Sequence, residues 1–250
     1  MPITPAHAAA AWPLHAVARR LPLAALVIGT FAPDLEYVLR LRPVGKFGHS
    51  PLGLVVFCIP VTLLLFWGWR GLVRPALAPL LPTGLRRELE APEPGRRTHL
   101  VPLAAIAALL GAASHVFWDG FTHPTGWAVG LIPFLSRSSS YFQLQYFTVG
   151  QYASSIFGAL VIALWIALNY FHVPARDRAF APGQRTRLAV AALIVGATSL
   201  IVALVNASFA TDVPWKLARA AIGAEIGFGL GLAAYALIRR KKPIDTQSGS

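Results

Sequence analysis

LAVAALIVGATSLIVALVNASF, residues 188–209, points directly to the fold class because the whole run contains no charged side chain. As an α-helix it extends about 33 Å at roughly 1.5 Å per residue, enough to cross the roughly 30 Å hydrocarbon core of a bilayer. Comparable apolar runs occupy residues 51–69, 152–171 and 217–238, and a slightly shorter one occupies 101–118. These runs predict a protein that crosses a membrane several times.

The composition and the charge agree with a membrane protein. The chain is 56% hydrophobic and 13% charged, whereas soluble domains carry about 25% charged residues. Its net charge of +12 comes from 22 Lys and Arg residues against 10 Asp and Glu residues. The basic residues lie mostly in short segments between apolar runs, as in cytoplasmic membrane loops. We therefore expect membrane lipids as partners and no nucleic acid.

Two shorter apolar segments at the amino terminus predict a helical hairpin, either spanning or re-entrant. They occupy residues 6–18 and 22–39 and turn at Arg19 and Arg20. Together with the longer runs they predict an all-α, polytopic membrane helix bundle of six or seven helices, including this short hairpin. We expect one integral membrane domain over residues 1–243 and a disordered tail over residues 244–250.

Two connecting segments are predicted to lack helices. Residues 77–97 combine Pro, Glu and Arg, which is typical of a solvated cytoplasmic loop. Residues 120–151 contain Gly and Pro among many aromatic side chains, which favours a loop at the level of the lipid headgroups. A loop of that length usually has a function, such as a lid or a binding loop.

Lys and Arg clusters predict the orientation, because they favour the cytoplasmic side. The three clusters are Arg70, Arg74, Arg86, Arg87, Arg96 and Arg97; Arg176, Arg178, Arg185 and Arg187; and Arg239, Arg240, Lys241 and Lys242. Alternating helices place all three on one face. We expect a bacterial inner membrane with the carboxyl terminus in the cytoplasm, and Arg40, Arg42 and Lys46 on the outer face.

The sharpest polar pattern is SHVFWDGFTH, residues 114–123. His115 and Asp119 are four residues apart and therefore project from one helix face. His123 extends this stripe only if the helix continues through Gly120. A histidine and a carboxylate at this spacing can present two ligands to one metal ion, and ionisable groups inside a membrane usually mark function. The alternative is a buried hydrogen-bonded pair without a metal.

Three more polar residues belong to the same predicted membrane face. His7 begins the amino-terminal hairpin, Asp34 follows Pro33 at a predicted helix break, and His49 immediately precedes the 51–69 run. Together with His115 and Asp119, they offer five nitrogen and oxygen ligands on four segments. This set suits zinc, with manganese or iron as alternatives. One ion needs only three or four ligands, so the surplus permits one or two ions.

The basic residues near Asp34 allow two interpretations. Asp34 and Glu36 could simply form ion pairs with Arg40 and Arg42. Arg40, Arg42 and Lys46 could instead attract a substrate phosphate beside a metal, although such residues more often extend toward the membrane interface. Both interpretations stay open at the level of the sequence.

The motifs MPITPAH (1–7), GTFAPDLEY (29–37), FGHS (47–50) and HVFWD (115–119) resemble, in this order, a bacterial membrane family described as domain of unknown function 4184. The resemblance covers most of the chain. The chain is also similar to predicted membrane-bound metal-dependent hydrolases and, more remotely, to zinc-dependent phospholipase C.

The phospholipase resemblance implies metal ligands at His7, Asp34, His49, His115 and Asp119. It also implies a role for Asp34 as general base. The later His-x-x-x-Glu pair and the amino-terminal Trp ligand of the phospholipases are missing here, which implies one or two ions rather than three.

The expected function is therefore that of a membrane-bound metal-dependent hydrolase. We expect it to act on a phosphoester of a phospholipid or lipid-linked substrate at the outer membrane face. Asp34 or Asp119 would orient or deprotonate the attacking water, and Arg40, Arg42 and Lys46 would bind the substrate. The alternative is a non-enzymatic transporter or scaffold with an ion-binding polar cluster.

Overall fold

The computed structural model describes residues 4–92 and 99–241, and this part of the chain is helical without a β-strand. The helices, with η for 3-10 or π-helical segments, are η1 (Thr4–Ala10), α1 (Ala11–Val17), α2 (Leu23–Phe31), η2 (Ala32–Asp34), α3 (Leu35–Arg40), α4 (Pro51–Gly53), η3 (Leu54–Cys58), α5 (Ile59–Gly68), η4 (Trp69–Val73), α6 (Arg74–Leu77), η5 (Ala78–Leu80), α7 (Thr83–Glu90), α8 (Leu100–Thr122), α9 (Trp127–Leu131), η7 (Pro133–Ser136), α10 (Tyr146–His172), η8 (Ala175–Asp177), α11 (Gln184–Ser208) and α12 (Val213–Lys241). The predicted all-α class is confirmed, and the predicted tail at residues 244–250 lies outside the described residues.

Five helical stretches among the described residues are long and apolar enough to cross a membrane. They are Pro51–Leu80, Leu100–Thr122, Tyr146–His172, Gln184–Ser208 and Val213–Arg240. Large apolar side chains stay exposed along them, including Leu160 at 62%, Leu193 at 71% and Leu200 at 60%. Exposed apolar surface of this kind suits contact with lipid. The five predicted runs are confirmed, and each is longer than its apolar core alone.

The first of these stretches contains two π-helical turns, and each turn precedes a proline. The turn η3 ends two residues before Pro60, and η4 ends two residues before Pro75. Proline lacks an N–H and collides with the carbonyl four residues earlier. A wider π turn relieves this conflict while the helix continues. Residues 51–80 therefore remain one continuous helical stretch.

The two segments predicted to be loops without helices both contain helical turns, so the prediction that they lack helices was wrong. Helix α7 lies within residues 77–97, where Arg86 and Glu90 form an i,i+4 pair at 3.1 Å. Helix α8 continues through Gly120 to Thr122, and α9 follows within residues 120–151. A side chain at position 120 would collide with the Trp127 ring. Gly120 therefore does not end the helix. Its missing side chain leaves room for the Trp127 indole to pack against α8.

The chain divides into two compact units. The first contains the described residues within 1–36, 45–66 and 93–169, and the second contains those within 37–44, 67–92 and 170–241.

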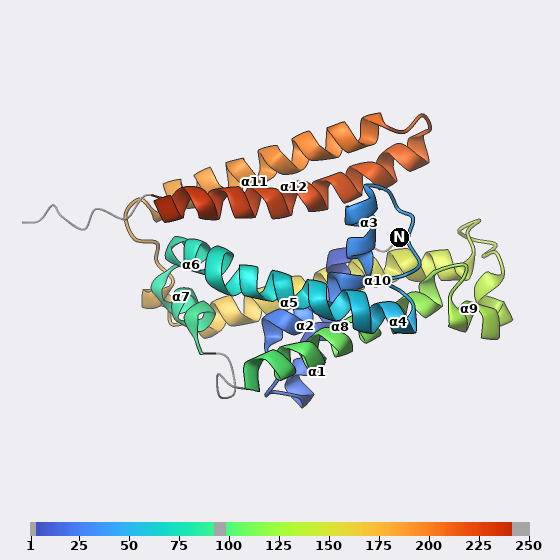
Figure 1. Cartoon of the computed structure of the whole chain (residues 1–250), viewed down its shortest axis with the longest axis horizontal. Helices are drawn as coiled ribbons and strands as arrows, with labels where there is room; N and C mark the ends of the chain where they lie inside the picture. The colour runs from blue at the N-terminus through green and yellow to red at the C-terminus, as the bar shows by residue number, and fades with distance from the viewer. Residues whose placement is uncertain (1–3, 93–98, 242–250) are drawn as a thin grey trace, which may run out of the picture. The chain divides into compact units, whose positions relative to one another are not determined.

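In the first unit, α2 packs directly against α8 (Figure 1). Two glycines allow this approach, because a Cβ at Gly111 would meet the Leu26 carbonyl oxygen and one at Gly29 would meet the Ala108 backbone. Small residues let helix backbones come close in a membrane. The close crossing brings the end of α2, with Thr30, beside the polar half of α8.

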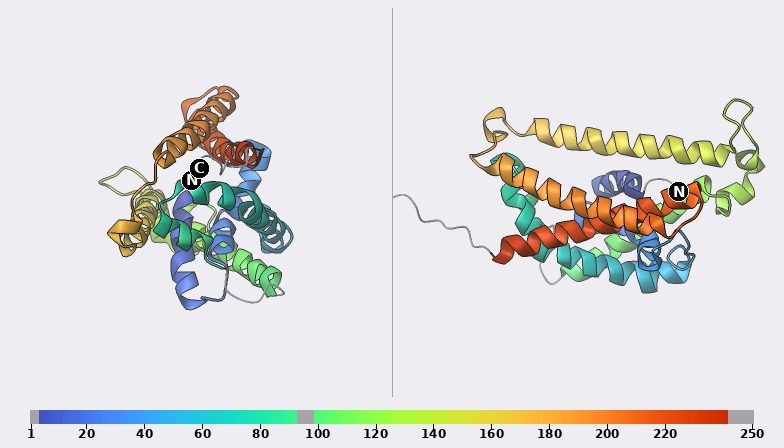
Figure 2. Two further views of the ribbon diagram at one scale, coloured as in Figure 1. Left: turned by 90° about the vertical axis from the view of Figure 1, so that its left-hand side faces the viewer. Right: turned by 90° about the horizontal axis from the view of Figure 1, so that it is seen from above.

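In the second unit, α11 and α12 form a long antiparallel hairpin, seen side by side in both Figure 1 and Figure 2. Gly223, Gly227 and Gly231 recur every four residues on the α12 face that touches α11, where a Cβ would meet the α11 backbone. Near the turn, the Asn206 side chain donates to the Arg219 carbonyl at 2.8 Å and accepts from the Arg219 guanidinium at 3.2 Å. The hairpin thus combines glycine packing with one polar clasp.

Candidate metal centre

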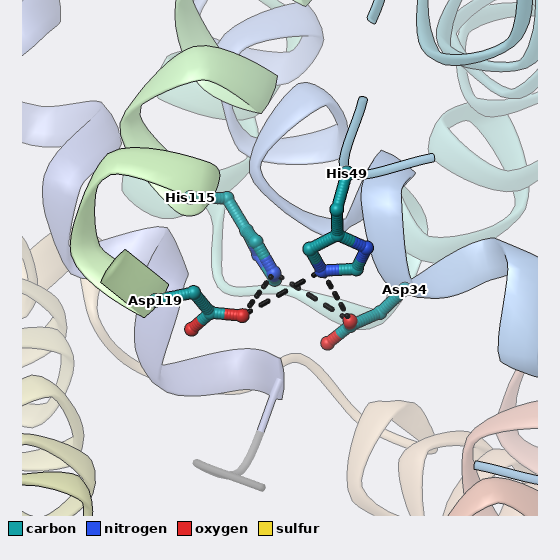
Figure 3. A group of neighbouring side chains, drawn as sticks. All are labelled: Asp34, His49, His115 and Asp119. Atoms are coloured by element: carbon teal, nitrogen blue, oxygen red, sulfur yellow. Dashed lines mark ion pairs between the residues drawn. The ribbon is translucent and has the colours of Figure 1, made fainter. Parts of the chain in front are cut away.

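Four side chains from three separate segments of the first unit converge on one point (Figure 3). Asp34 comes from η2, His49 from the loop before α4, and His115 and Asp119 from α8. One ligand atom of each lies within 4.8 Å of all the others. His115 is 1% exposed, Asp34 5% and Asp119 8%. Buried ionisable groups are costly unless they are paired or bind a metal.

The four ligand atoms of Asp34, His49, His115 and Asp119 form a closed ring of non-bonded contacts, in which nitrogen and oxygen atoms alternate (hereafter the ring). His115 Nε2 lies 3.2 Å from Asp119 Oδ2 and 3.5 Å from Asp34 Oδ1. His49 Nε2 lies 3.5 Å from Asp34 Oδ1 and 3.6 Å from Asp119 Oδ2. Charge-assisted hydrogen bonds are shorter, at about 2.7–2.9 Å. A tetrahedral zinc with bonds of about 2.05 Å places its ligand atoms about 3.3 Å apart. The spacing is longer than that of charge-assisted hydrogen bonds and is compatible with a shared ion.

The orientation of His115 is fixed by a backbone carbonyl. Its Nδ1 lies 2.7 Å from the carbonyl oxygen of Thr30. A carbonyl can only accept, so Nδ1 carries the proton and the Nε2 lone pair faces the ring in the neutral imidazole. Within the described residues, this buried Nε2 makes no hydrogen bond. Histidine ligands of metals are commonly held by such a carbonyl on the other nitrogen.

The loop that presents His49 is held from two sides. The Gly48 N–H donates to the Glu36 carboxylate at 2.9 Å, and the Cys58 thiol donates to the Gly48 carbonyl at 3.4 Å. Gly48 also lies so close to the Pro33 carbonyl that a Cβ would collide with it. These contacts place His49 against the Pro33–Asp34 segment.

Charge around His49 favours its protonated form when the ring holds no cation. Burial lowers the pKa of His49, but the carboxylates of Asp119 and Asp34 raise it more, so its pKa lies above the ordinary 6.5. The same carboxylates would attract a divalent cation, which would then compete with that proton.

The family model described as Domain of unknown function (DUF4184) matches residues 1–237. The chain belongs to this family. No curated protein and no solved structure matches the chain. All four motifs that carried the resemblance to DUF4184 lie within the matched residues, as do the four residues of the ring.

Two more histidines of this DUF4184 chain flank the second carboxylate oxygen of Asp119. His7 Nε2 lies 3.4 Å and His123 Nδ1 lies 3.5 Å from Asp119 Oδ1. His7 also stacks on the His115 ring, with ring centroids 3.9 Å apart. The structure thus brings His7 next to the ring of four but outside it. His123 lies at the end of α8, close enough to contact Asp119 because the helix persists through Gly120.

The predicted substrate-binding residues are divided between the two units. Lys46 is exposed and belongs to the first unit, three residues before His49, whereas Arg40 and Arg42 belong to the second unit. Their predicted contact with a substrate phosphate remains a prediction.

Two supporting residues were not recognised from the sequence. Thr30 acts through its backbone carbonyl, which no residue pattern reveals. Glu36 was interpreted only as a partner of nearby arginines, yet it also anchors Gly48. The available signal was the acid two residues after Asp34 together with the glycine directly before His49.

Proposed function

We propose that the chain is a membrane-bound metal-dependent hydrolase that cleaves a phosphoester of a lipid or lipid-linked substrate. The observation that carries this proposal is the buried ring of two histidines and two aspartates with the spacing of a shared ion. Such nitrogen and oxygen sets are typical of hydrolytic metal sites. The proposal follows the resemblance that the sequence motifs suggest to membrane-bound metal-dependent hydrolases and, more remotely, to zinc-dependent phospholipase C.

The proposed ion is zinc, with manganese or iron as alternatives, held by Asp34, His49, His115 and Asp119. A zinc ion in this position would lower the pKa of its bound water toward about 7 and polarise the phosphoryl oxygen. The two oxygens of Asp119 face different histidines, which is compatible with one ion or two.

The side chains of the protein would hold the ligands of the ion, orient the attacking water and accept its proton. The Asp34 carboxylate would accept the proton of the attacking water, and Asp119 would orient that water. Thr30 and Glu36 would hold His115 and the His49 loop in place. Positive charge at Lys46, which belongs to the same unit as the centre, would attract the substrate phosphate.

The proposed setting is a bacterial inner membrane, with the centre at the outer face and the carboxyl terminus in the cytoplasm. The proposed bundle has six or seven helices, the five long spans plus the amino-terminal hairpin. Alkaline phosphatase fused after Trp127 tests the orientation. An active reporter is expected, and an inactive one would reverse the proposed orientation.

The function itself is tested on full-length protein purified in detergent and loaded with zinc, manganese or iron. We expect phosphate or phosphoester release from phospholipids in mixed micelles, at least 100-fold slower for Asp34→Asn, which removes the proposed base. Asp177→Asn is the matched control, because Asp177 belongs to the second unit. Stoichiometric metal without any phosphoester turnover would support the non-enzymatic, ion-binding alternative instead.

A further inference from the structure

An apolar cavity lies between the amino-terminal segment, α8 and α10, with His7, a neighbour of Asp119, in its wall. Its volume is about 340 Å³, within the range of roughly 300–1,000 Å³ of ligand pockets. One wall of the cavity is formed by His7, Ser114 and Trp118. The wall on α10 is formed by Ser154, Phe157 and Val161. His7 is thus shared by the cavity and by the surroundings of Asp119.

A second, smaller apolar cavity lies next to the first. It has about 150 Å³, shares Ala9 and Val161 with the first cavity, and reaches Trp165. From Ser154 to Trp165, the two cavities follow α10 for about 16 Å at roughly 1.5 Å per residue. Because α10 is long and apolar enough to span a membrane, this track runs along a spanning helix.

The two serine hydroxyls on the cavity wall already make hydrogen bonds within their own helices. Ser114 Oγ donates to the Gly111 carbonyl at 2.7 Å, and Ser154 Oγ donates to the Gln151 carbonyl at 3.1 Å. Within the described residues, His7 Nε2 is buried without a hydrogen bond. The cavity therefore presents an apolar length with one polar end.

We propose that these two cavities bind one hydrocarbon chain of the lipid substrate, with its phosphate headgroup at the metal centre. An amphiphile matches the arrangement, because its chain would lie along a spanning helix while its head reaches the buried ring. Phe157 is 62% exposed and Trp118 44% exposed at the rim, so a chain can enter sideways from the bilayer. This inference rests on the proposed function and adds a substrate-chain site to it.

Photolabelling of the full-length, metal-loaded protein in detergent tests the site. The probe is dodecyl phosphate with a diazirine in its chain, and the comparison probe is the same chain ending in an alcohol. We expect the phosphate probe to label peptides of η1 and α10, and to label them less after metal removal by a chelator. Equal labelling by both probes would mean that the cavity accepts any membrane chain, which would overturn the inference.

Ser154→Phe fills the cavity at its α10 wall, away from the four residues of the ring. We expect about tenfold less labelling by dodecyl phosphate, because the introduced phenylalanine side chain would exclude several methylenes of the probe from the cavity. Ala153→Phe is the matched control, because Ala153 is exposed on the same helix and does not line the cavity. Undiminished labelling in Ser154→Phe would overturn the inference.

Metal content separates failure of this inference from failure of the proposed function. Both variants should keep the wild-type metal content, because neither changes a ring residue. A metal-loaded protein that turns over lipid phosphoesters but shows no Ser154-sensitive labelling would refute the chain site alone. A protein that lacks metal would refute the proposed function and, with it, the headgroup part of this inference.

Discussion

Two helix pairs in this protein approach closely at glycines, yet different polar groups lie beside the two contacts. The α2–α8 pair meets at Gly29 and Gly111, and the α11–α12 pair meets along Gly223, Gly227 and Gly231. Beside the first crossing lies a ring of two histidines and two aspartates. Beside the second lies the Asn206–Arg219 clasp near the turn.

The difference shows that small residues let two helix backbones come close, but that a binding site also needs polar side chains beside the contact. In both pairs, the missing Cβ lets the backbones touch, as is common between membrane helices. Only in the first pair does the contact place a carbonyl, that of Thr30, where it can orient a histidine. Changes at the first pair should therefore affect ion binding, and changes at the second should affect stability alone.

The largest expected effect is the loss of metal in His115→Ala. This change removes one of the four proposed ligands, so the metal content of the purified protein should fall from about one ion per chain or more to near zero. Elemental analysis of the purified protein gives the readout. His172→Ala is the control, because His172 is exposed at the end of α10. Equal metal contents in the two variants would contradict a centre at His115.

Leucine at the two glycine contacts compares the pairs directly. Gly111→Leu should separate α2 from α8, lowering both thermal stability and metal content. Gly227→Leu should destabilise the hairpin by about 1–3 kcal/mol, the typical effect of overpacking, with the metal content unchanged. Thermal unfolding in detergent combined with metal analysis measures both effects. Metal loss in Gly227→Leu would show that the two pairs are not independent.

A smaller effect is expected from the support of the His49 loop. Glu36→Ala removes the acceptor of the Gly48 N–H and should weaken metal affinity about 10–100-fold, as is usual for groups that orient metal ligands. Glu36→Gln should recover most of the affinity, since its amide oxygen can accept the same hydrogen bond. Competition with a chromogenic chelator measures the affinity. An affinity of Glu36→Ala equal to the wild type would exclude this supporting role.

The smallest graded effect is that of pH. Metal binding needs neutral histidines, so affinity should fall as the pH decreases and protons compete for them. Because the pKa of His49 lies above its ordinary 6.5, the decrease should already begin near neutral pH. Chelator competition at pH 8, 7 and 6 follows the trend. A constant affinity over this range would contradict histidine ligation.

The sequence by itself predicted the membrane-length helices and all four polar residues of the candidate centre. Long uncharged runs admit few structures, because a backbone in hydrocarbon must satisfy its own hydrogen bonds. The spacing of His115 and Asp119 likewise follows from the period of one helix. Asp34 and His49 were recognised differently, as polar residues at the ends of apolar segments.

Only the tertiary structure decided how these residues meet and what holds them. The Trp127 indole packs against α8 at Gly120, where a side chain would collide with it. The Thr30 carbonyl sets the orientation of His115, and Glu36 holds the loop of His49. Each of these contacts joins residues that are separated in the chain, so no local period or propensity encodes it. The spacing of the ring, and hence its fit to an ion, results from that long-range packing.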